Sequence, residues 1–382
     1  MTARPELRAL TSVRGLAAWM VVLYHIRLSI AGLPQAWVDV FAKGYLAVDF
    51  FFLLSGFVIW LTYGARLRER NASVVAFWQR RIARIYPLHL VMLASATLLA
   101  LALAATGRHD PAEFPFAALP LHLLLVQDWG LTDALAWNDP AWSISAEFAA
   151  YLLFPLLARA IDWRRVPTLA LIAAIAAFLA ILGGVMARAD APGLGWEIST
   201  FGVLRCLTEF SAGTALCALW LRWAERPLLP AVGAAIVATA LLGGWAAGVL
   251  PELFAVPIGM AALLLLLALT AGRARNPLEW GPLHRLGEIS YATYLSHFLL
   301  FVVFKLLMVS DASAIPPVLI ALYLLLVLAA SIALYHLVER PAQKWVNAIR
   351  LSGRLPGTKQ STAHWKKPQP REEPLGEDRL FR

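Results

Sequence analysis

Ten apolar windows of roughly 20 residues follow one another along this 382-residue chain. A helix rises about 1.5 Å per residue, so a window of this length spans a hydrocarbon core about 30 Å thick. We therefore expect an all-α polytopic membrane protein, a bundle of about ten transmembrane helices. The windows lie near residues 9–30, 45–64, 82–105, 142–161, 167–187, 201–223, 229–248, 253–271, 288–309 and 315–337.

The composition points to the same class of protein. Hydrophobic residues make up 60% of the chain and charged residues only 15%, with a mean hydropathy of +0.67, outside the usual range of soluble domains. A further apolar piece, "FAALPLHLLLVQDW", is too short to cross a membrane. Residues 1–348 are expected to form one membrane domain. The polar, Pro- and Gly-rich residues 349–382 are expected to form a disordered cytoplasmic tail.

The basic residues predict the orientation of the bundle, because cytoplasmic loops retain Lys and Arg. With the N-terminus inside, every inner connection carries arginines, whereas the outer connections carry only Arg27, Lys43, Arg108 and Arg188. Both termini should therefore be cytoplasmic. The same distribution accounts for the net charge of +9 without a nucleic-acid partner, since no single basic patch interleaved with aromatic residues is present.

The first window contains two ionisable residues, Arg14 and His25, which cost free energy to place within a membrane. They are eleven residues apart, so on a helix they lie within about 20° of one another and about 16 Å apart along the axis. Ionisable groups within spans usually face the bundle interior or a water-filled cavity. The pair therefore indicates one functional helix face.

Helical rise also assigns depths to two carboxylates. His25 lies about 24 Å from the inner end of its span, and Asp49 and Glu147 lie about 6 to 8 Å below the outer face. The three side chains could meet, and a carboxylate beside His25 would orient it as a general base. The alternative for Asp49 is a hydrogen bond to a neighbouring helix.

The inner ends of the spans collect arginines, whose planar forks suit phosphate. They include Arg14 and the "RRIAR" segment with Arg81 and Arg84. Anchoring of the cytoplasmic side is the alternative for "RRIAR". His297 falls near mid-membrane. For the outer aromatic residues, including Trp129, Trp137 and Trp142, the alternative to a role in the site is an interfacial belt.

Several motifs in order resemble the acyltransferase-3 family of bacterial membrane acyltransferases. They are Arg-x10-His in the first span, "GYLAVDFFFLLSGFVI", "RRIARIYP", "WSISAEFAAYLLFPLL", "LGEISYATYLSH" and "LVERP", and they cover roughly residues 8–345. The resemblance implies a multi-pass protein of the bacterial cytoplasmic membrane. It also implies transfer of an acyl group, most often acetyl, from cytoplasmic acyl-CoA to a hydroxyl of a sugar, polysaccharide or similar acceptor at the outer side.

The resemblance also implies roles for individual residues. His25 would be the essential histidine, oriented by Glu147 or Asp49, and Arg14 its paired arginine. Arg81 and Arg84 match arginines that meet the CoA phosphates. Trp142, Ser143 and Glu147 match the family's Trp-Ser-Leu-x-Val-Glu pattern. Trp142, Ser143 and His297 are the candidate substrate-binding residues. Two departures stand out: Ala146 replaces the usual Val, and "HFLL" replaces the commoner His-x-Pro at His297.

Two other classes of protein are alternatives to an enzyme. A transporter or flippase would use the same buried Arg, His and Glu for a substrate or proton path, but no internal repeat is visible. A membrane scaffold gives no reason for Arg14 and His25 to share a face. No metal is expected, and the oligomeric state is not predicted.

Overall fold

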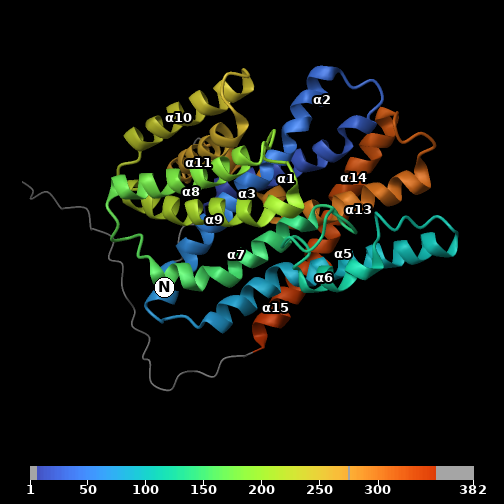
Figure 1. Ribbon diagram of the computed structural model, residues 1–382, viewed down its shortest axis with the longest axis horizontal. Helices are drawn as coiled ribbons and strands as arrows, with labels where there is room; N and C mark the ends of the chain where they lie inside the picture. Colours follow the sequence, from blue (N-terminus) through green and yellow to red (C-terminus); the bar gives the residue numbers. More distant parts are fainter. Residues whose placement is uncertain (1–6, 274–275, 350–382) are drawn as a thin grey trace, which may run out of the picture.

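The computed structural model describes residues 7–273 and 276–349 of the chain (Figure 1). In these residues the secondary structure is helical, and an isolated bridge pairs Ile30 with Ile315. The tail predicted over residues 349–382 lies, apart from Ile349, outside the described residues.

Ten helices in the described part of the chain are long and apolar enough to cross a membrane, which confirms the expected number. Only the third begins far from its predicted start, at Val74 instead of near residue 82, so the "RRIAR" arginines lie on a helix. The ten are α1 (Arg8–Ile26), α3 (Ala47–Ile59), α5 (Val74–Ala105), α7 (Ala141–Ala160), α8 (Thr168–Arg188), α9 (Ile198–Trp223), α10 (Leu228–Ala246), α11 (Glu252–Thr270), α13 (Ser290–Met308) and α14 (Pro317–Leu334).

Shorter elements connect or extend these spans. Two are π-helical turns, a form that is frequent at functional sites: η3 (Trp60–Gly64) and η6 (Tyr335–Glu339). The remaining short helices are α2 (Gln35–Ala42), α4 (Ala65–Arg68), α6 (Leu119–Leu124), α12 (Gly281–Glu288) and α15 (Arg340–Ala348), with 3-10 turns η1 (Arg27–Ser29), η2 (Lys43–Leu46), η4 (Phe116–Ala118) and η5 (Pro277–Glu279).

Helix α9 forms the centre of the bundle. Of the ten spans it is the most buried, at 78%, and the least apolar. The spans of α10 and α14 are the least buried, at 17% and 22%, and both are more apolar than α9. Lipid is the solvent for peripheral helices, so the apolar helices face outward and the polar one is enclosed by protein.

Close backbone packing joins α3 to α9. A Cβ atom on Gly56 would overlap the carbonyl oxygen of Phe210, and one on Gly213 would overlap that of Leu53. Small residues allow membrane helices to approach to van der Waals contact, where packing rather than hydrophobicity drives association. Asp49 on α3 is thereby held against Arg205 on α9.

Different short helices lie at the two ends of the bundle (Figure 1). We call the end holding the start of α1 the Arg14 end; α15 lies there. The opposite end, where α1 finishes and α2 lies, is the His25 end. Figure 1 also shows α8 to α11 grouped on one side of the bundle and α5, α13 and α14 on the other.

The connection over residues 106–140 folds onto the His25 end. As expected, its apolar piece does not cross: it forms only the six-residue α6. Trp129 Nε1 donates to the Ser145 carbonyl at 3.0 Å, and Asn138 Nδ2 donates to the Leu295 carbonyl at 2.8 Å. Trp137 and Trp142 are buried, so an interfacial belt is the wrong interpretation for both of these residues.

Candidate active site

One face of α1 carries Arg14 and His25 and lies against α12 and α13. Arg14 donates from Nε to Ser290 Oγ at 2.9 Å and from Nη2 to the Gly287 carbonyl at 2.8 Å. At the other end of the helix, His25 Nδ1 lies 3.1 Å from His297 Nε2. Both side chains therefore contact the same neighbouring segment, as their spacing on one helix face predicts.

The hydrogen bonds of His25 define where its proton lies. His25 Nδ1 is 2.9 Å from the Val21 carbonyl, which can only accept, so Nδ1 carries the proton. His297 Nδ1 is likewise 3.1 Å from the Thr293 carbonyl, which leaves His297 Nε2 to accept from His25. In the neutral ring this leaves Nε2 of His25 as the nitrogen without a proton, which is the form that a general base requires.

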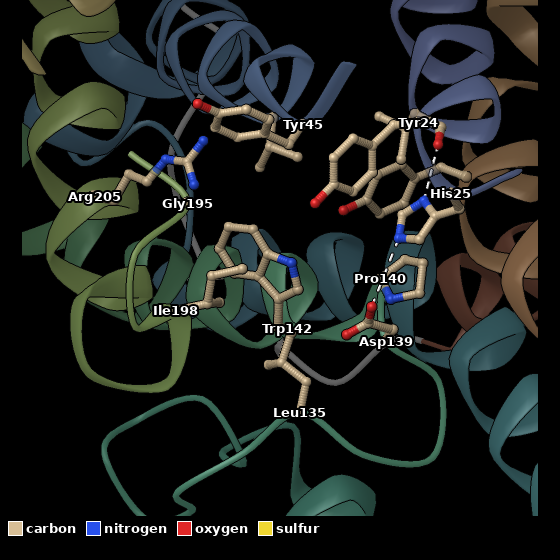
Figure 2. Close-up of a pocket in the computed structure, with 13 residues that line it drawn as sticks. Tyr24, His25, Tyr45, Leu135, Asp139, Pro140, Trp142, Gly195, Ile198 and Arg205 are labelled. Atoms are coloured by element: carbon tan, nitrogen blue, oxygen red, sulfur yellow. Dashed lines mark hydrogen bonds and ion pairs between the residues drawn. The ribbon is translucent and has the colours of Figure 1, made fainter. Parts of the chain in front are cut away.

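The carboxylate that accompanies His25 is Asp139, in the connection just before α7. Asp139 Oδ2 lies 3.6 Å from His25 Nε2, and the two side chains are 32% and 14% exposed (Figure 2). The separation is longer than a hydrogen bond but within ion-pair distance. Asp139 can therefore stabilise the positive charge that forms when Nε2 takes a proton.

These groups line a pocket of about 140 Å³ at the His25 end. Figure 2 shows His25 and Asp139 on one side and Arg205 with Tyr45 on the other. The wall combines aliphatic side chains with three tyrosines and a tryptophan, whose polar tips are suited to hydroxyl-bearing ligands. The lining residues are Val21, Tyr24, His25, Tyr45, Val48, Leu135, Asp139, Pro140, Trp142, Gly195, Ile198, Arg205 and Tyr294.

Two predicted substrate-binding residues differ in their relation to this pocket. Trp142 lines it, with the Arg205 guanidinium 5.6 Å from the centre of its ring. Ser143 is buried behind the wall, where its Oγ lies 2.7 Å from the Tyr294 hydroxyl and donates to the Pro140 carbonyl at 3.1 Å. Ser143 therefore orients Tyr294, which does line the pocket.

Asp49 does not contact His25, contrary to the arrangement inferred from depth. Its two carboxylate oxygens accept from Arg205 Nε and Nη2 at 2.6 and 2.5 Å, and both side chains are buried. A buried guanidinium needs such a partner, so the ion pair takes up both oxygens. The alternative, a bond from Asp49 to a neighbouring helix, is confirmed.

Glu147 is also separated from His25. It accepts hydrogen bonds from Ser55 and, at 2.6 Å, from Tyr151. No hydrogen bond or ion pair among the described residues joins Glu147 to His25, and its charge acts on Arg14 and Arg84 as well as on Tyr294. Depth along a helix does not specify which neighbour a side chain faces, and the predicted meeting of the three groups was wrong for that reason.

A second, larger pocket of about 550 Å³ lies at the Arg14 end. Four cations and two carboxylates are among its lining residues, which are Thr11, Arg14, Arg84, Glu288, Tyr335, Glu339, Arg340, Gln343, Lys344 and Asn347. Arg84 pairs with the buried Glu339. Arg81 lies instead over the rings of Tyr63 and Tyr151, 5.5 and 5.8 Å from their centres, so of the two predicted phosphate ligands on α5 only Arg84 lines this pocket.

Asp128 is a buried acid beside the first pocket. Within the described part of the chain, neither of its carboxylate oxygens has a hydrogen-bond partner. It lies in the connection before α7, outside the membrane-spanning helices. Burial raises the pKa of this carboxyl to about 8, against the opposing effect of the Arg205 charge. Among the described residues no group of three His, Cys, Asp or Glu side chains forms a metal site.

Sequence reasoning did not identify several residues of the two pockets, among them Arg205, Asp139 and Lys344. Arg205 carried a usable signal, because an arginine within a span marks a functional or paired site. Asp139 fell between predicted spans, and its position before Pro140 carries no distinctive pattern. Lys344 lies beyond the last predicted span, where a lysine resembles any other cytoplasmic charge.

Comparison with known proteins gives a consistent set of similarities. The acyltransferase-3 family model, described as an acyltransferase domain, matches residues 7–336. The chain is 36% identical over 318 residues to acyltransferase MdmB of Streptomyces mycarofaciens, covering 77% of this chain and 79% of that protein. It is 30% identical over 336 residues to the exopolysaccharide production protein ExoZ of Rhizobium meliloti, covering 83% and 95% respectively. No solved structure matches the chain.

Proposed function

The chain belongs to the acyltransferase-3 family, and from this premise we propose that it transfers an acyl group, with acetyl the first to test, from cytoplasmic acyl-CoA to a sugar or polysaccharide hydroxyl. Membership makes it a multi-pass membrane O-acyltransferase rather than a transporter or flippase. The observation that carries the proposal is the hydrogen bonding of His25 to Val21 and His297, which leaves Nε2 free to act as a base beside a pocket.

Donor binding is assigned to the Arg14 end. Arg14 and Arg84 line a pocket large enough for a phosphorylated group, and arginine forks match phosphate oxygens. Acyl-CoA supplies an activated thioester carbonyl. Its pantetheine arm extends along the face of α1, over the roughly 16 Å that separate Arg14 from His25.

The transfer step is assigned to the His25 end. His25 Nε2 takes the proton of the acceptor hydroxyl as that oxygen forms a bond to the thioester carbon. Asp139 stabilises the resulting imidazolium, and His297 holds the ring through its other nitrogen. The carbon–sulfur bond then breaks, and the proton passes from His25 to the departing thiolate. The products are an ester and a free thiol.

The remaining predicted site residues receive supporting roles in this proposal. Asp49 neutralises Arg205 at the pocket wall, and Glu147 orients Tyr151 and balances the charges of Arg14 and Arg84. Trp142 contributes an aromatic face for the acceptor.

In this proposal Ser143 and Arg81 act through neighbouring residues and do not contact the ligands. Ser143 holds Tyr294, and Arg81 packs on aromatic rings near the donor path.

Acceptor chemistry and orientation complete the proposal. Aromatic faces beside polar groups are suited to a sugar ring, and the similar protein ExoZ is named for exopolysaccharide production. The distribution of arginines supports an orientation with the Arg14 end at the cytoplasm and the His25 end at the outer face of the bacterial inner membrane. Donor and acceptor then enter from opposite sides.

Thiol release tests the proposed reaction. Purified full-length protein in detergent is given acetyl-CoA and a panel of glycans, with His25→Gln and, as a histidine control at the Arg14 end, His336→Ala. We expect His25→Gln to lower kcat about 10² to 10⁴-fold, because a general base contributes that much. The control should retain wild-type turnover.

Two results would contradict the proposal at different points. Wild-type turnover in His25→Gln would move the base to another residue. Absence of both turnover and CoA binding in the wild type would reject acyl-CoA as the donor.

A further inference from the structure

The short helix α15 presents one polar face to the pocket at the Arg14 end. At 100° per residue, Arg340, Gln343, Lys344 and Asn347 fall within an arc of about 100°. All four line the pocket. Trp345 lies on another side of the helix and is 70% exposed, as expected of a residue at a membrane interface.

Contacts with α5 and η6 hold α15 in this position. Gln79 Nε2, on α5, donates to the carbonyls of Val346 and Ile349 at 2.6 and 2.5 Å near the end of α15. At its start, the buried Glu339 pairs with Arg84 and accepts from Gln343 at 3.3 Å. The polar face is therefore a fixed wall of the pocket, continuous with the Arg84 side.

The charges of the pocket favour an anion with several negative groups. Arg14, Arg84, Arg340 and Lys344 oppose only Glu288 and Glu339, and Glu339 is already paired with Arg84. Neither Arg340 nor Lys344 forms an ion pair with another described residue. These two cations, four residues apart on one helix face, are therefore available to bind an anionic ligand.

We infer that the polar face of α15 is part of the donor site, with Arg340 and Lys344 binding the phosphates of the nucleotide end of acyl-CoA. This inference rests on the proposed function. It extends the site beyond the region that the family model matches, which ends at residue 336. Anionic lipid headgroups share the same phosphate chemistry, so the experiment must separate the two ligands.

Direct binding of CoA tests the inference without any acceptor. Full-length protein in nanodiscs of neutral lipid is titrated with CoA and with 3′-dephospho-CoA. The variants are Arg340→Ala, Lys344→Ala and, as an exposed arginine away from the pocket, Arg226→Ala. We expect each α15 variant to raise the Kd for CoA about three- to tenfold, the size of a part-exposed charge contact. Arg226→Ala should bind CoA as the wild type does.

The second ligand shows which phosphate is bound. If the 3′-phosphate is the partner, the variants should lose little affinity for 3′-dephospho-CoA relative to wild type. A proportional loss for both ligands would assign the diphosphate instead. Either pattern supports the inference.

Three results would overturn it. Unchanged CoA affinity in both variants, with the wild type binding, removes α15 from the site and leaves the proposed function intact. A loss of CoA affinity in the α15 variants that is seen only in nanodiscs containing anionic lipid, and not in those of neutral lipid, assigns the helix to lipid headgroups. A wild type that binds no CoA rejects the donor itself, and this inference with it.

Discussion

At the residue scale, the site depends on which atom of each side chain is already occupied. Nδ1 of His25 is held by Val21 and His297, so only Nε2 can exchange a proton with a substrate. Both oxygens of Asp49 are occupied by Arg205. Asp139 is part-exposed and faces the free nitrogen of His25, which makes it the carboxylate available to assist the reaction.

Replacing Asp139 by Asn should lower kcat about five- to tenfold, because the imidazolium of His25 loses a neighbouring charge worth about 1 kcal/mol at this exposure. KM for the acyl donor should not change, since the donor pocket lies at the other end. Steady-state kinetics with Asp139→Glu as the rescue and Asp133→Asn, an exposed acid of the same connection, as the control would check this. Equal activity of Asp139→Asn and wild type would exclude an electrostatic role.

The buried carboxyl of Asp128 should make stability depend on pH. Its folded pKa of about 8 lies above the usual value of 3.8, so the folded state retains a proton that the unfolded chain releases between those values. Stability should therefore fall as pH rises from about 4 to about 8. Asp128→Asn should raise the apparent Tm in detergent more at pH 8 than at pH 5. A shift of the same size at both values would contradict the assignment.

At the element scale, helix pairs position the polar groups. The α3–α9 contact brings Asp49 to Arg205, and the contact of α1 with α12 and α13 positions both Arg14 and His25. Each contact is made at small or polar residues, where membrane helices can pack closely or form hydrogen bonds. A change in helix packing should therefore disturb the site as well as stability.

Substituting Gly213 by Ala should destabilise the fold by about 1 to 3 kcal/mol, because the added methyl group overlaps the α3 backbone at Leu53. Gly233→Ala on α10 is the matched control, since no atom lies within 4 Å of its added Cβ. Thermal unfolding in detergent would compare them. A Gly213→Ala protein as stable as the control would mean that the two helices separate at little cost.

At the scale of the whole molecule, the protein has two pockets at opposite ends of one bundle. The larger one is rich in arginine, and the smaller one is rich in aromatic residues and holds His25. Helix α1 joins them through residues on one face. This arrangement suits a reaction whose two substrates come from different sides of a membrane.

Labelling with a membrane-impermeant maleimide tests the orientation. A cysteine at position 311, in the connection between α13 and α14 at the His25 end, should react in intact spheroplasts. A cysteine at position 226, at the Arg14 end, should react only after permeabilisation, because cytoplasmic loops retain the basic residues. The native Cys206 and Cys217 are buried, so the background should be low. The reverse pattern of reactivity would invert the proposed donor and acceptor sides.

The sequence by itself determined the class of protein, the number of spans and the shared face of Arg14 and His25. These properties follow from local quantities: the thickness of the bilayer, the rise of a helix and the 100° step between residues. The family motifs likewise lie in continuous stretches, so they were visible before any packing was known.

Only the tertiary structure decided which groups meet. Asp49 pairs with Arg205, Glu147 accepts from Ser55 and Tyr151, and Asp139 accompanies His25. Side chains at the same depth can still face different neighbours, because helix rotation and tilt are set by close packing between segments distant in sequence. The position of α15 beside the larger pocket follows from such contacts too, which no local pattern contains.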